Sequence, residues 1–112
     1  KRLILNVALN YGGRLDIVNS VNKFYNNKKK IKKITEKNIN SGLYTKGQSD
    51  VDLLIRTGGQ QRMSNFLLWQ SSYAEFYFMD KLWPEFRRGD LGEAVLNYSQ
   101  RLRKFGKVVE ND

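Results

Sequence analysis

The sequence contains no cysteine, no histidine and only one proline among its 112 residues. Without cysteine, neither a disulfide framework nor a thiolate metal site can form, and without histidine the commonest general base and metal ligand is missing. These absences exclude Ser-His-Asp triads, cysteine–histidine catalysis and imidazole-bound zinc. Any metal would have to be held by carboxylates, which favours a hard cation such as Mg²⁺.

Long apolar runs are missing as well. No stretch approaches the ~20 apolar residues that a membrane-spanning helix needs, and no charged-then-apolar leader opens the chain. Hydrophobic residues make up 40% of the chain and charged residues 28%, which is typical of a soluble globular protein. We therefore expect one small domain with a buried core, located in the cytoplasm with or without membrane association.

Positive charge is in clear excess. Twenty Lys and Arg residues stand against eleven Asp and Glu, for a net charge of +9, and the run at 28–33 supplies five of the lysines. Such a balance indicates an anionic partner: a nucleic acid, an acidic membrane surface or a phosphorylated small molecule. The lysine run itself is typical of a solvated helix end or surface loop. A basic nucleic-acid-binding module is the alternative function, although we find no RNA- or DNA-binding motif.

The order of apolar runs predicts an α/β fold. Short apolar runs indicate buried strands, and apolar residues at helical spacing indicate helices, one of them with Thr35 as its N-cap. Strands that alternate with helices indicate a parallel sheet with right-handed crossovers. No linker marks an internal domain boundary. The predicted strands are 3–9, 51–55 and 75–78, and the predicted helices are 15–25, 35–43, 66–73 and 91–105.

Two glycine-rich loops share one arrangement. Each follows a predicted strand, contains a Gly-Gly pair with an arginine, and leads into a predicted helix. In an open α/β sheet such loops lie where ligands bind, and a helix N-terminus offers unpaired N–H groups to an anion. The first loop holds Gly12–Gly13 and Arg14, for which an ordinary turn is the simpler interpretation.

The second loop carries the stronger signal. Arg56 and Arg62 flank its Gly58–Gly59 pair, and Ser64 or Asn65 can cap the helix predicted to follow. The forked guanidinium of arginine suits bidentate contact with phosphate oxygens. A turn followed by a helix cap would explain the glycines and Ser64, but two arginines in the same loop favour a phosphate site.

Two acidic residues stand beside the predicted strands. Glu75 opens the aromatic strand 75–78, where a carboxylate is costly to bury unless it is paired or bound to a metal. It predicts either a salt bridge to an arginine or a Mg²⁺ ligand or proton acceptor near the phosphate site. For Asp52 we expect a structural role that tethers the arginine loop. The nearby apolar residues are typical of a core and dense enough for a dimer face as well: Phe66, Leu67, Leu68, Trp69, Tyr73, Phe76 and Phe78.

A resemblance to the cis-prenyltransferase family rests on three motifs in the family's order and spacing. They are NYGGRLDIV at 10–18, DLLIRTGGQQRMSNFLLWQSSYAEFYF at 52–78 and LWPEF at 82–86. The resemblance implies an α/β fold that forms the C-terminal half of a mostly parallel sheet flanked by helices. Residues 1–106 would then be the C-terminal portion of a single cis-prenyltransferase domain, and residues 107–112 a tail.

The resemblance also implies an enzymatic activity. The family condenses isopentenyl diphosphate with an allylic diphosphate, usually farnesyl diphosphate, and uses Mg²⁺ to build cis double bonds. The product expected here is a long-chain polyprenyl diphosphate, the undecaprenyl lipid carrier of bacteria. Family members are homodimers. The lipid product would allow peripheral contact with a membrane. No nucleic acid is expected to bind.

Site residues follow from the motif positions. Arg56, Arg62 and Ser64 would hold the diphosphate of isopentenyl diphosphate. Glu75 would ligate Mg²⁺, reaching across the dimer interface into the partner's site. Leu3 would lie along the hydrophobic tunnel that accepts the growing chain.

Several departures from the family pattern set limits on this assignment. Family chains are longer, and their N-terminal half carries the catalytic aspartate loop and the allylic-substrate residues. We therefore expect this chain to contain no catalytic residue, to be inactive alone and to be poorly stable alone. Gln60 and Gln61 replace an acidic residue and a histidine, and Lys104 replaces the arginine of an Arg-x-Gly element. A non-catalytic partner subunit is a third interpretation, against which the retained arginine loop and Glu75 argue.

Overall fold

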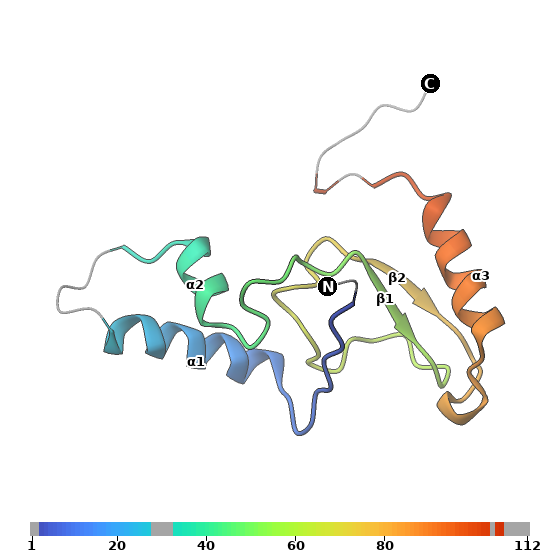
Figure 1. The fold of residues 1–112 in the computed structure, drawn as a ribbon, viewed down its shortest axis with the longest axis horizontal. Helices are drawn as coiled ribbons and strands as arrows, with labels where there is room; N and C mark the ends of the chain where they lie inside the picture. Colours follow the sequence, from blue (N-terminus) through green and yellow to red (C-terminus); the bar gives the residue numbers. More distant parts are fainter. Residues whose placement is uncertain (1–2, 28–32, 104, 107–112) are drawn as a thin grey trace. The chain divides into compact units, whose positions relative to one another are not determined.

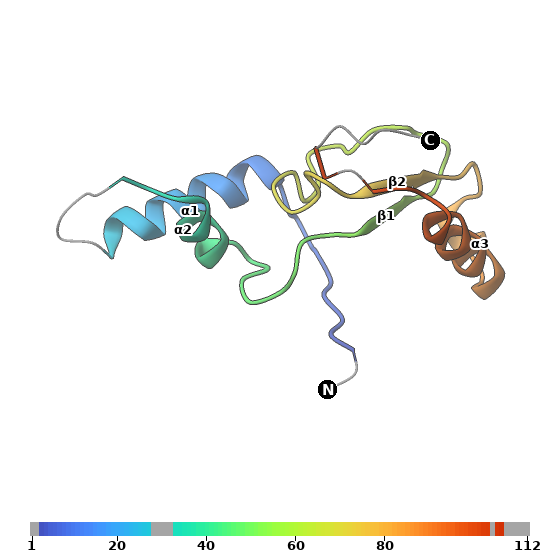
Figure 2. The same ribbon diagram turned by 90° about the horizontal axis from the view of Figure 1, so that it is seen from above.

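The structure is a computed structural model that describes residues 3–27, 33–103 and 105–106. Its fold is α/β, as predicted, with one parallel sheet and helices (Figures 1 and 2). The chain divides into two compact units: unit 1 comprises Lys1–Gln48 and Ser64–Trp69, and unit 2 comprises Ser49–Met63 and Gln70–Asp112. In chain order the elements are α1 (Gly13–Asn26), α2 (Glu36–Gly42), β1 (Leu53–Arg56), β2 (Glu75–Phe78), the 3-10 helix η1 (Trp83–Glu85) and α3 (Arg88–Ser99).

Unit 1 is built on the packing of α1 against α2, which lie side by side in both views (Figures 1 and 2). Ile39 of α2 and its C-cap Leu43 are buried, and the buried Ser20 hydroxyl of α1 donates to the carbonyl of Ile39 at 2.5 Å. The start of α2 follows the prediction. Thr35 is its N-cap and forms a capping box with Asn38, which fixes the point where the chain enters the helix.

Unit 2 is built on the two parallel strands, with α3 beside β2. In the sheet, Leu53 pairs with Glu75 and Arg56 pairs with Phe78. The strand predicted at 75–78 is confirmed with the same bounds, and the strand predicted at 51–55 is present as Leu53–Arg56. Because β1 and β2 are parallel, the residues after Arg56 and after Phe78 leave the sheet at the same edge.

The first predicted strand is wrong. Residues 3–8 form no regular structure, and the apolar side chains of the segment are largely exposed, with Leu3 at 85% and Leu9 at 83%. A strand requires a neighbour for its backbone hydrogen bonds. The described residues form only two strands, β1 and β2, and both pair within unit 2.

The predicted helix over 66–73 is also wrong, because the segment is a series of turns. Ser64, Asn65 and Leu67 have φ values of 51°, 63° and 44°, which a right-handed helix does not allow. The turns continue to Tyr73, and within them the carbonyl of Gln70 accepts from the amide of Val51 at 2.9 Å. The segment is therefore held by contacts to other parts of the chain rather than by its own helical bonds.

The closing helix was predicted over 91–105 and instead covers Arg88–Ser99. It starts early because the Asp90 carboxylate accepts from the amide of Arg87, the N-cap residue, at 2.8 Å, a contact that sequence periodicity does not reveal. It ends early because Arg101 and Arg103 turn back toward the residues around β2, where they make the contacts described below. Tertiary hydrogen bonds thus replace the helical ones at this end.

Some predictions fall outside the described residues: most of the lysine run, at 28–32, then Lys104, and the tail at 107–112. The division into a domain over 1–106 and a tail stays a prediction. No helix in the described part of the chain is long and apolar enough to cross a membrane.

Candidate functional site

The loop that follows β1 is joined to the segment that follows β2. The amide of Gly58 donates to the carbonyl of Lys81 at 2.9 Å, and the amide of Gly59 donates to that of Met79 at 3.0 Å. Both glycines have positive φ, at 91° and 81°, so a side chain would be strained there. Their amides bond to protein carbonyls, and the glycines therefore shape the loop rather than offer N–H groups to an anion.

Arg56 and Arg62 lie together in this loop. Nη1 of Arg56, the last residue of β1, donates to the carbonyl of Arg62, so the first arginine holds the backbone of the second. Nη2 of Arg62 donates to the side-chain oxygen of Gln60. Gln60 thus orients an arginine, a role that its position in the motif did not suggest. The loop places two cationic forks at the carboxyl end of β1, an arrangement suited to an anion.

Ser64 belongs to unit 1, whereas the two arginines belong to unit 2. Ser64 is exposed and adopts a left-handed backbone conformation. It does not begin a helix. The next residue, Asn65, instead caps α1: its backbone carbonyl accepts from the amide of Gly13 at 2.6 Å, and its side-chain oxygen accepts from the amide of Arg14 at 3.0 Å.

Glu75 forms the salt bridge that was one of its two predicted roles. Its Oε1 lies 3.3 Å from Nη1 of Arg101, and both side chains are partly buried. The same guanidinium donates to the carbonyl of Phe76 at 2.7 Å and, through Nε, to the side-chain oxygen of Asn97 at 2.8 Å. Arg101 therefore ties the start of β2 to the end of α3.

A complete metal site is not formed by residues 3–27, 33–103 and 105–106, which contain no group of three His, Cys, Asp or Glu side chains that could hold an ion. Glu75 would supply one carboxylate and needs further ligands from elsewhere. Mg²⁺ is commonly held by one or two carboxylates together with water and substrate phosphates, so a single carboxylate is compatible with a shared site.

Asp52 has a structural role, but its expected partner was wrong. Its carboxylate accepts from Nη1 of Arg103 at 2.8 Å, not from the arginine loop. Arg103 also donates to the Tyr98 hydroxyl at 3.0 Å and to the carbonyl of Tyr73 at 3.0 Å, and it lies 4.2 Å from the ring centroid of Phe105. The hydrogen bond with Asp52 raises the pKa of the Arg103 guanidinium, which stays charged.

Sequence reasoning missed both Arg101 and Arg103. The available signal was indirect: two carboxylates at the ends of predicted strands needed basic partners, and two arginines stood two residues apart near the end of the chain. Nothing in the local pattern linked them, because the contacts join residues at least 25 positions apart.

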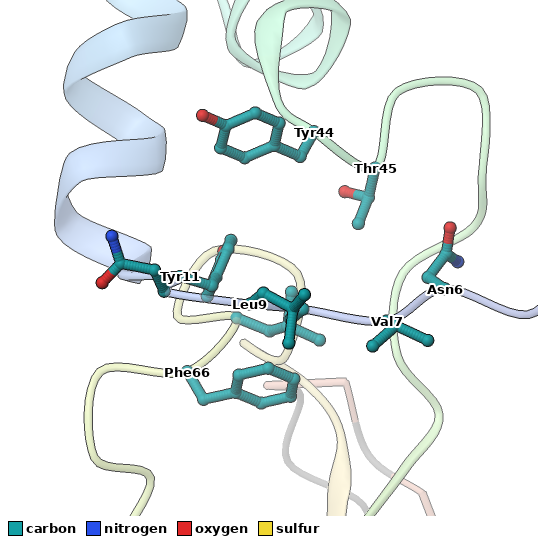
Figure 3. A pocket seen from close by; sticks show the side chains of 10 residues that line it. Asn6, Val7, Leu9, Tyr11, Tyr44, Thr45 and Phe66 are labelled. Carbon is teal, nitrogen blue, oxygen red and sulfur yellow. The ribbon is translucent and has the colours of Figure 1, made fainter.

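A cavity of about 530 Å³ lies within unit 1 (Figure 3). The ring of Tyr11 meets those of Phe66 and Tyr44 edge-on, with centroids 5.6 and 6.2 Å away. The Tyr11 hydroxyl donates to the buried carboxylate of Asp16 at 2.8 Å, which fixes the ring at the cavity wall. Leu3, predicted to line a lipid tunnel, is not among the lining residues: Asn6, Val7, Ala8, Leu9, Asn10, Tyr11, Tyr44, Thr45, Phe66 and Leu67.

Comparison with known proteins gives consistent matches. Residues 1–106 match the prenyltransferase family model described as "Putative undecaprenyl diphosphate synthase". The isoprenyl transferase of Oceanobacillus iheyensis is 44% identical over 110 residues, which cover 95% of this chain and 44% of that protein. The (2E,6E)-farnesyl-diphosphate-specific ditrans,polycis-undecaprenyl-diphosphate synthase of Pasteurella multocida is 47% identical over 112 residues, or 96% of this chain and 47% of that protein.

Solved structures agree with the sequence matches. A probable undecaprenyl diphosphate synthase of Campylobacter jejuni superposes on the chain with a TM-score of 0.76 at 36% sequence identity. The lavandulyl diphosphate synthase of Lavandula x intermedia, solved in complex with dimethylallyl diphosphate, superposes with a TM-score of 0.81 at 41% identity. Each match covers 87% of this chain and 44% of the other. The chain thus spans about half the length of the curated relatives that it matches. These matches confirm the resemblance inferred from the motifs, and the chain belongs to the undecaprenyl diphosphate synthase family of prenyltransferases.

Proposed function

We propose that the chain supplies the isopentenyl diphosphate site of a cis-prenyltransferase that extends farnesyl diphosphate to a long-chain polyprenyl diphosphate. The observation that carries the proposal is the pairing of Arg56 with Arg62 in one loop, in a chain of this family. The name of the Pasteurella multocida relative, which specifies farnesyl diphosphate, supports the choice of allylic substrate.

In this proposal Arg56, Arg62 and Ser64 hold the diphosphate of isopentenyl diphosphate. Arginine forks and a hydroxyl are donors that a diphosphate requires, and fixing it orients the acceptor double bond for attack on the allylic carbon. The backbone contact from Arg56 to Arg62 supports a preformed site, because it restrains the loop before substrate arrives. In this proposal the role of the chain is to bind and orient the acceptor.

Glu75 is proposed as one Mg²⁺ ligand, with Leu3 along the tunnel for the growing chain. Mg²⁺, when bound, would stabilise the charge of a departing diphosphate. The ion pair with Arg101 holds the Glu75 carboxylate at the start of β2, so the residue is anchored in place. A homodimer whose partner completes the metal site, and membrane contact through the lipid product, belong to the same proposal.

Calorimetric titration of the chain with isopentenyl diphosphate and Mg²⁺ tests the binding site. Arg62→Ala is expected to weaken binding about 10- to 100-fold, the usual effect of removing one hydrogen-bonding charged group. Arg88→Ala is the matched control, because it removes the same charge from an exposed position on α3. Equal affinities for the two variants would contradict the site.

Single-stranded RNA serves as the parallel titrant for the nucleic-acid alternative. That alternative predicts binding that weakens steeply with salt and that loses little more with Arg62→Ala than with Arg88→Ala. It is favoured by the net charge of +9, the lysine run at 28–33 and the aromatic content of 12%. RNA binding without diphosphate binding would replace the prenyltransferase proposal.

A chimaera tests the activity. This chain would replace the matching segment of the Oceanobacillus iheyensis isoprenyl transferase, to which it is 44% identical. Condensation of isopentenyl diphosphate with farnesyl diphosphate by the chimaera, and its loss with Arg62→Ala, is the expected result. A well-folded chimaera that binds farnesyl diphosphate but not isopentenyl diphosphate would refute the proposal.

A further inference from the structure

One residue of the second glycine-rich motif bonds to the first glycine-rich loop. Asn65 accepts from the amides of Gly13 and Arg14, through its backbone carbonyl at 2.6 Å and its side-chain oxygen at 3.0 Å. The three residues belong to unit 1, although about fifty positions separate them along the chain. Asn65 has a φ of 63°, a conformation that asparagine tolerates better than most residues.

The bonds satisfy a need at the start of α1. The first amides of a helix have no partner within it, and a side chain at the N-cap normally accepts from one of them. The N-cap of α1 is Gly12, which has no side chain to do this. Asn65 takes over that function from a distant part of the chain and accepts from two amides at once.

Close approach explains the Gly-Gly pair of the first loop. A Cβ atom at Gly13 would lie 2.9 Å from the carbonyl oxygen of Asn65 and 2.9 Å from Cγ of Leu68, and one at Gly12 would lie 3.1 Å from Nδ2 of Asn65. Distances this short leave no room for a side chain at Gly13. The glycines therefore leave space for the turn that contains Asn65. The amides of Gly13 and Arg14, which were candidates for binding an anion, donate to Asn65 instead.

We infer that Asn65 is a positioning residue, which fixes the neighbouring Ser64 relative to α1 and so prepares Ser64 to bind diphosphate. The inference rests on the proposed function, because it takes Ser64 to be a diphosphate ligand. Ser64 is exposed and has a left-handed backbone conformation. Its neighbour Asn65 accepts the two hydrogen bonds from the amides of α1. Without that anchor the turn would have to be ordered when substrate binds, at an expected cost of about tenfold in affinity.

The test compares two asparagine-to-glycine variants of the chain. Asn65→Gly removes the side-chain acceptor and still permits a positive φ, so it isolates the hydrogen bond from backbone strain. Asn10→Gly is the control, because Asn10 also has a positive φ, 52°, and does not cap α1. Amide hydrogen exchange at Arg14 reports the cap, and calorimetry with isopentenyl diphosphate reports the site.

We expect Asn65→Gly to speed exchange of the Arg14 amide and to weaken isopentenyl diphosphate binding about tenfold, while Asn10→Gly changes neither. Asn65→Asp keeps the acceptor oxygen and should retain slow exchange. In the chimaera, Asn65→Gly should raise KM for isopentenyl diphosphate and leave kcat nearly unchanged, a split that general destabilisation would not produce.

Three results would overturn the inference in distinguishable ways. Fast exchange of Arg14 in the parent chain would show that Asn65 does not cap α1. Fast exchange of the Arg14 amide in Asn65→Gly, with unchanged affinity for isopentenyl diphosphate, would show that Asn65 caps α1 but does not position Ser64. Slow exchange that depends on Asn65, in a chain and chimaera that bind no isopentenyl diphosphate, would refute the proposed function and with it the positioning role.

Discussion

Gly42 ends α2 at the point where that helix meets α1, and an alanine there would collide with the backbone of α1. A Cβ atom on Gly42 would lie 2.9 Å from Cα and 3.0 Å from Cβ of Ser20, and closer still to the hydroxyl oxygen. Rotation of the serine side chain can move the hydroxyl but not the α-carbon. The Gly42→Ala variant therefore has to separate the two helices.

The size of the effect follows from two opposing terms. Alanine favours a helix over glycine by about 0.5 to 1 kcal/mol, and less at the last residue than in the interior. Overpacking of a well-packed contact costs about 1 to 3 kcal/mol. Ile39 and Leu43 are both buried, and Ser20 is itself buried and bonded to the carbonyl of Ile39. We expect a net destabilisation of about 1 to 2 kcal/mol.

Urea unfolding followed by circular dichroism measures this change, with Gly92→Ala as the matched control. Gly92 lies within α3, and a Cβ atom added there meets nothing within 4 Å. The same substitution should stabilise α3 by about 0.5 to 1 kcal/mol. The two variants are thus predicted to shift the midpoint in opposite directions. A Gly42→Ala protein as stable as the parent chain or more stable would refute the close approach of α1 and α2.

Two further predictions concern the charged contacts of unit 2. Arg101→Gln removes the ion pair to Glu75 and should lower the free energy of unfolding in urea by about 1 kcal/mol. The control Arg88→Gln, at an exposed position, should change that free energy little. Equal effects of the two variants would contradict an anchoring role for Arg101. The hydrogen bond from Lys81, and a second from a backbone amide, lower the pKa of Asp90 below its ordinary value of 3.8. The charged form therefore stabilises the fold fully above that value and loses this effect as pH falls through the lowered pKa. Asp90→Asn should accordingly reduce the fall of the urea midpoint below about pH 5. An unchanged acid dependence would refute that assignment.

The elements predicted correctly are those whose signals are local. The capping pair Thr35 and Asn38 stands three residues apart, so the start of α2 could be read from sequence. The aromatic run 75–78 is a strand with the predicted bounds, because its residues have high strand propensity and its neighbour β1 lies in the same unit. In both cases the interactions that decide the structure are close in sequence or made within one unit.

The elements predicted wrongly are decided by distant contacts. The run after Asn65 has the composition of a helix, but Asn65 bonds to α1 and adopts a left-handed conformation that stops a helix at its first turn. The end of α3 is set in the same way by Arg101, which bonds to the carbonyl of Phe76 twenty-five positions away. Helix propensity differs by less than about 1 kcal/mol per ordinary residue, so a few tertiary hydrogen bonds outweigh it.

The candidate site shows the same division. Residue type and spacing singled out the arginine loop, and in the structure the side chain of Arg56 bonds to the backbone of Arg62 within it. Amides of both Gly-Gly pairs donate to carbonyls of the chain rather than to an anion. Gly58 shapes its loop, and Gly13 makes room for Asn65. A Gly-Gly pair reports that backbones come close, and it does not say whether the neighbour is an anion or another part of the same chain.

Residues 3–9 show what an apolar run can and cannot specify. Consecutive apolar side chains predict a strand covered on both faces, because only a buried parallel strand hides them all. The backbone of such a strand also needs neighbours, and its own sequence does not encode them. In unit 1 no strand of the described residues pairs with the run, and Leu5 is 82% exposed. The apolar pattern therefore predicts that these side chains are buried, but it does not specify what buries them. The exposure of Leu5 shows that nothing in the described part of unit 1 covers its side chain.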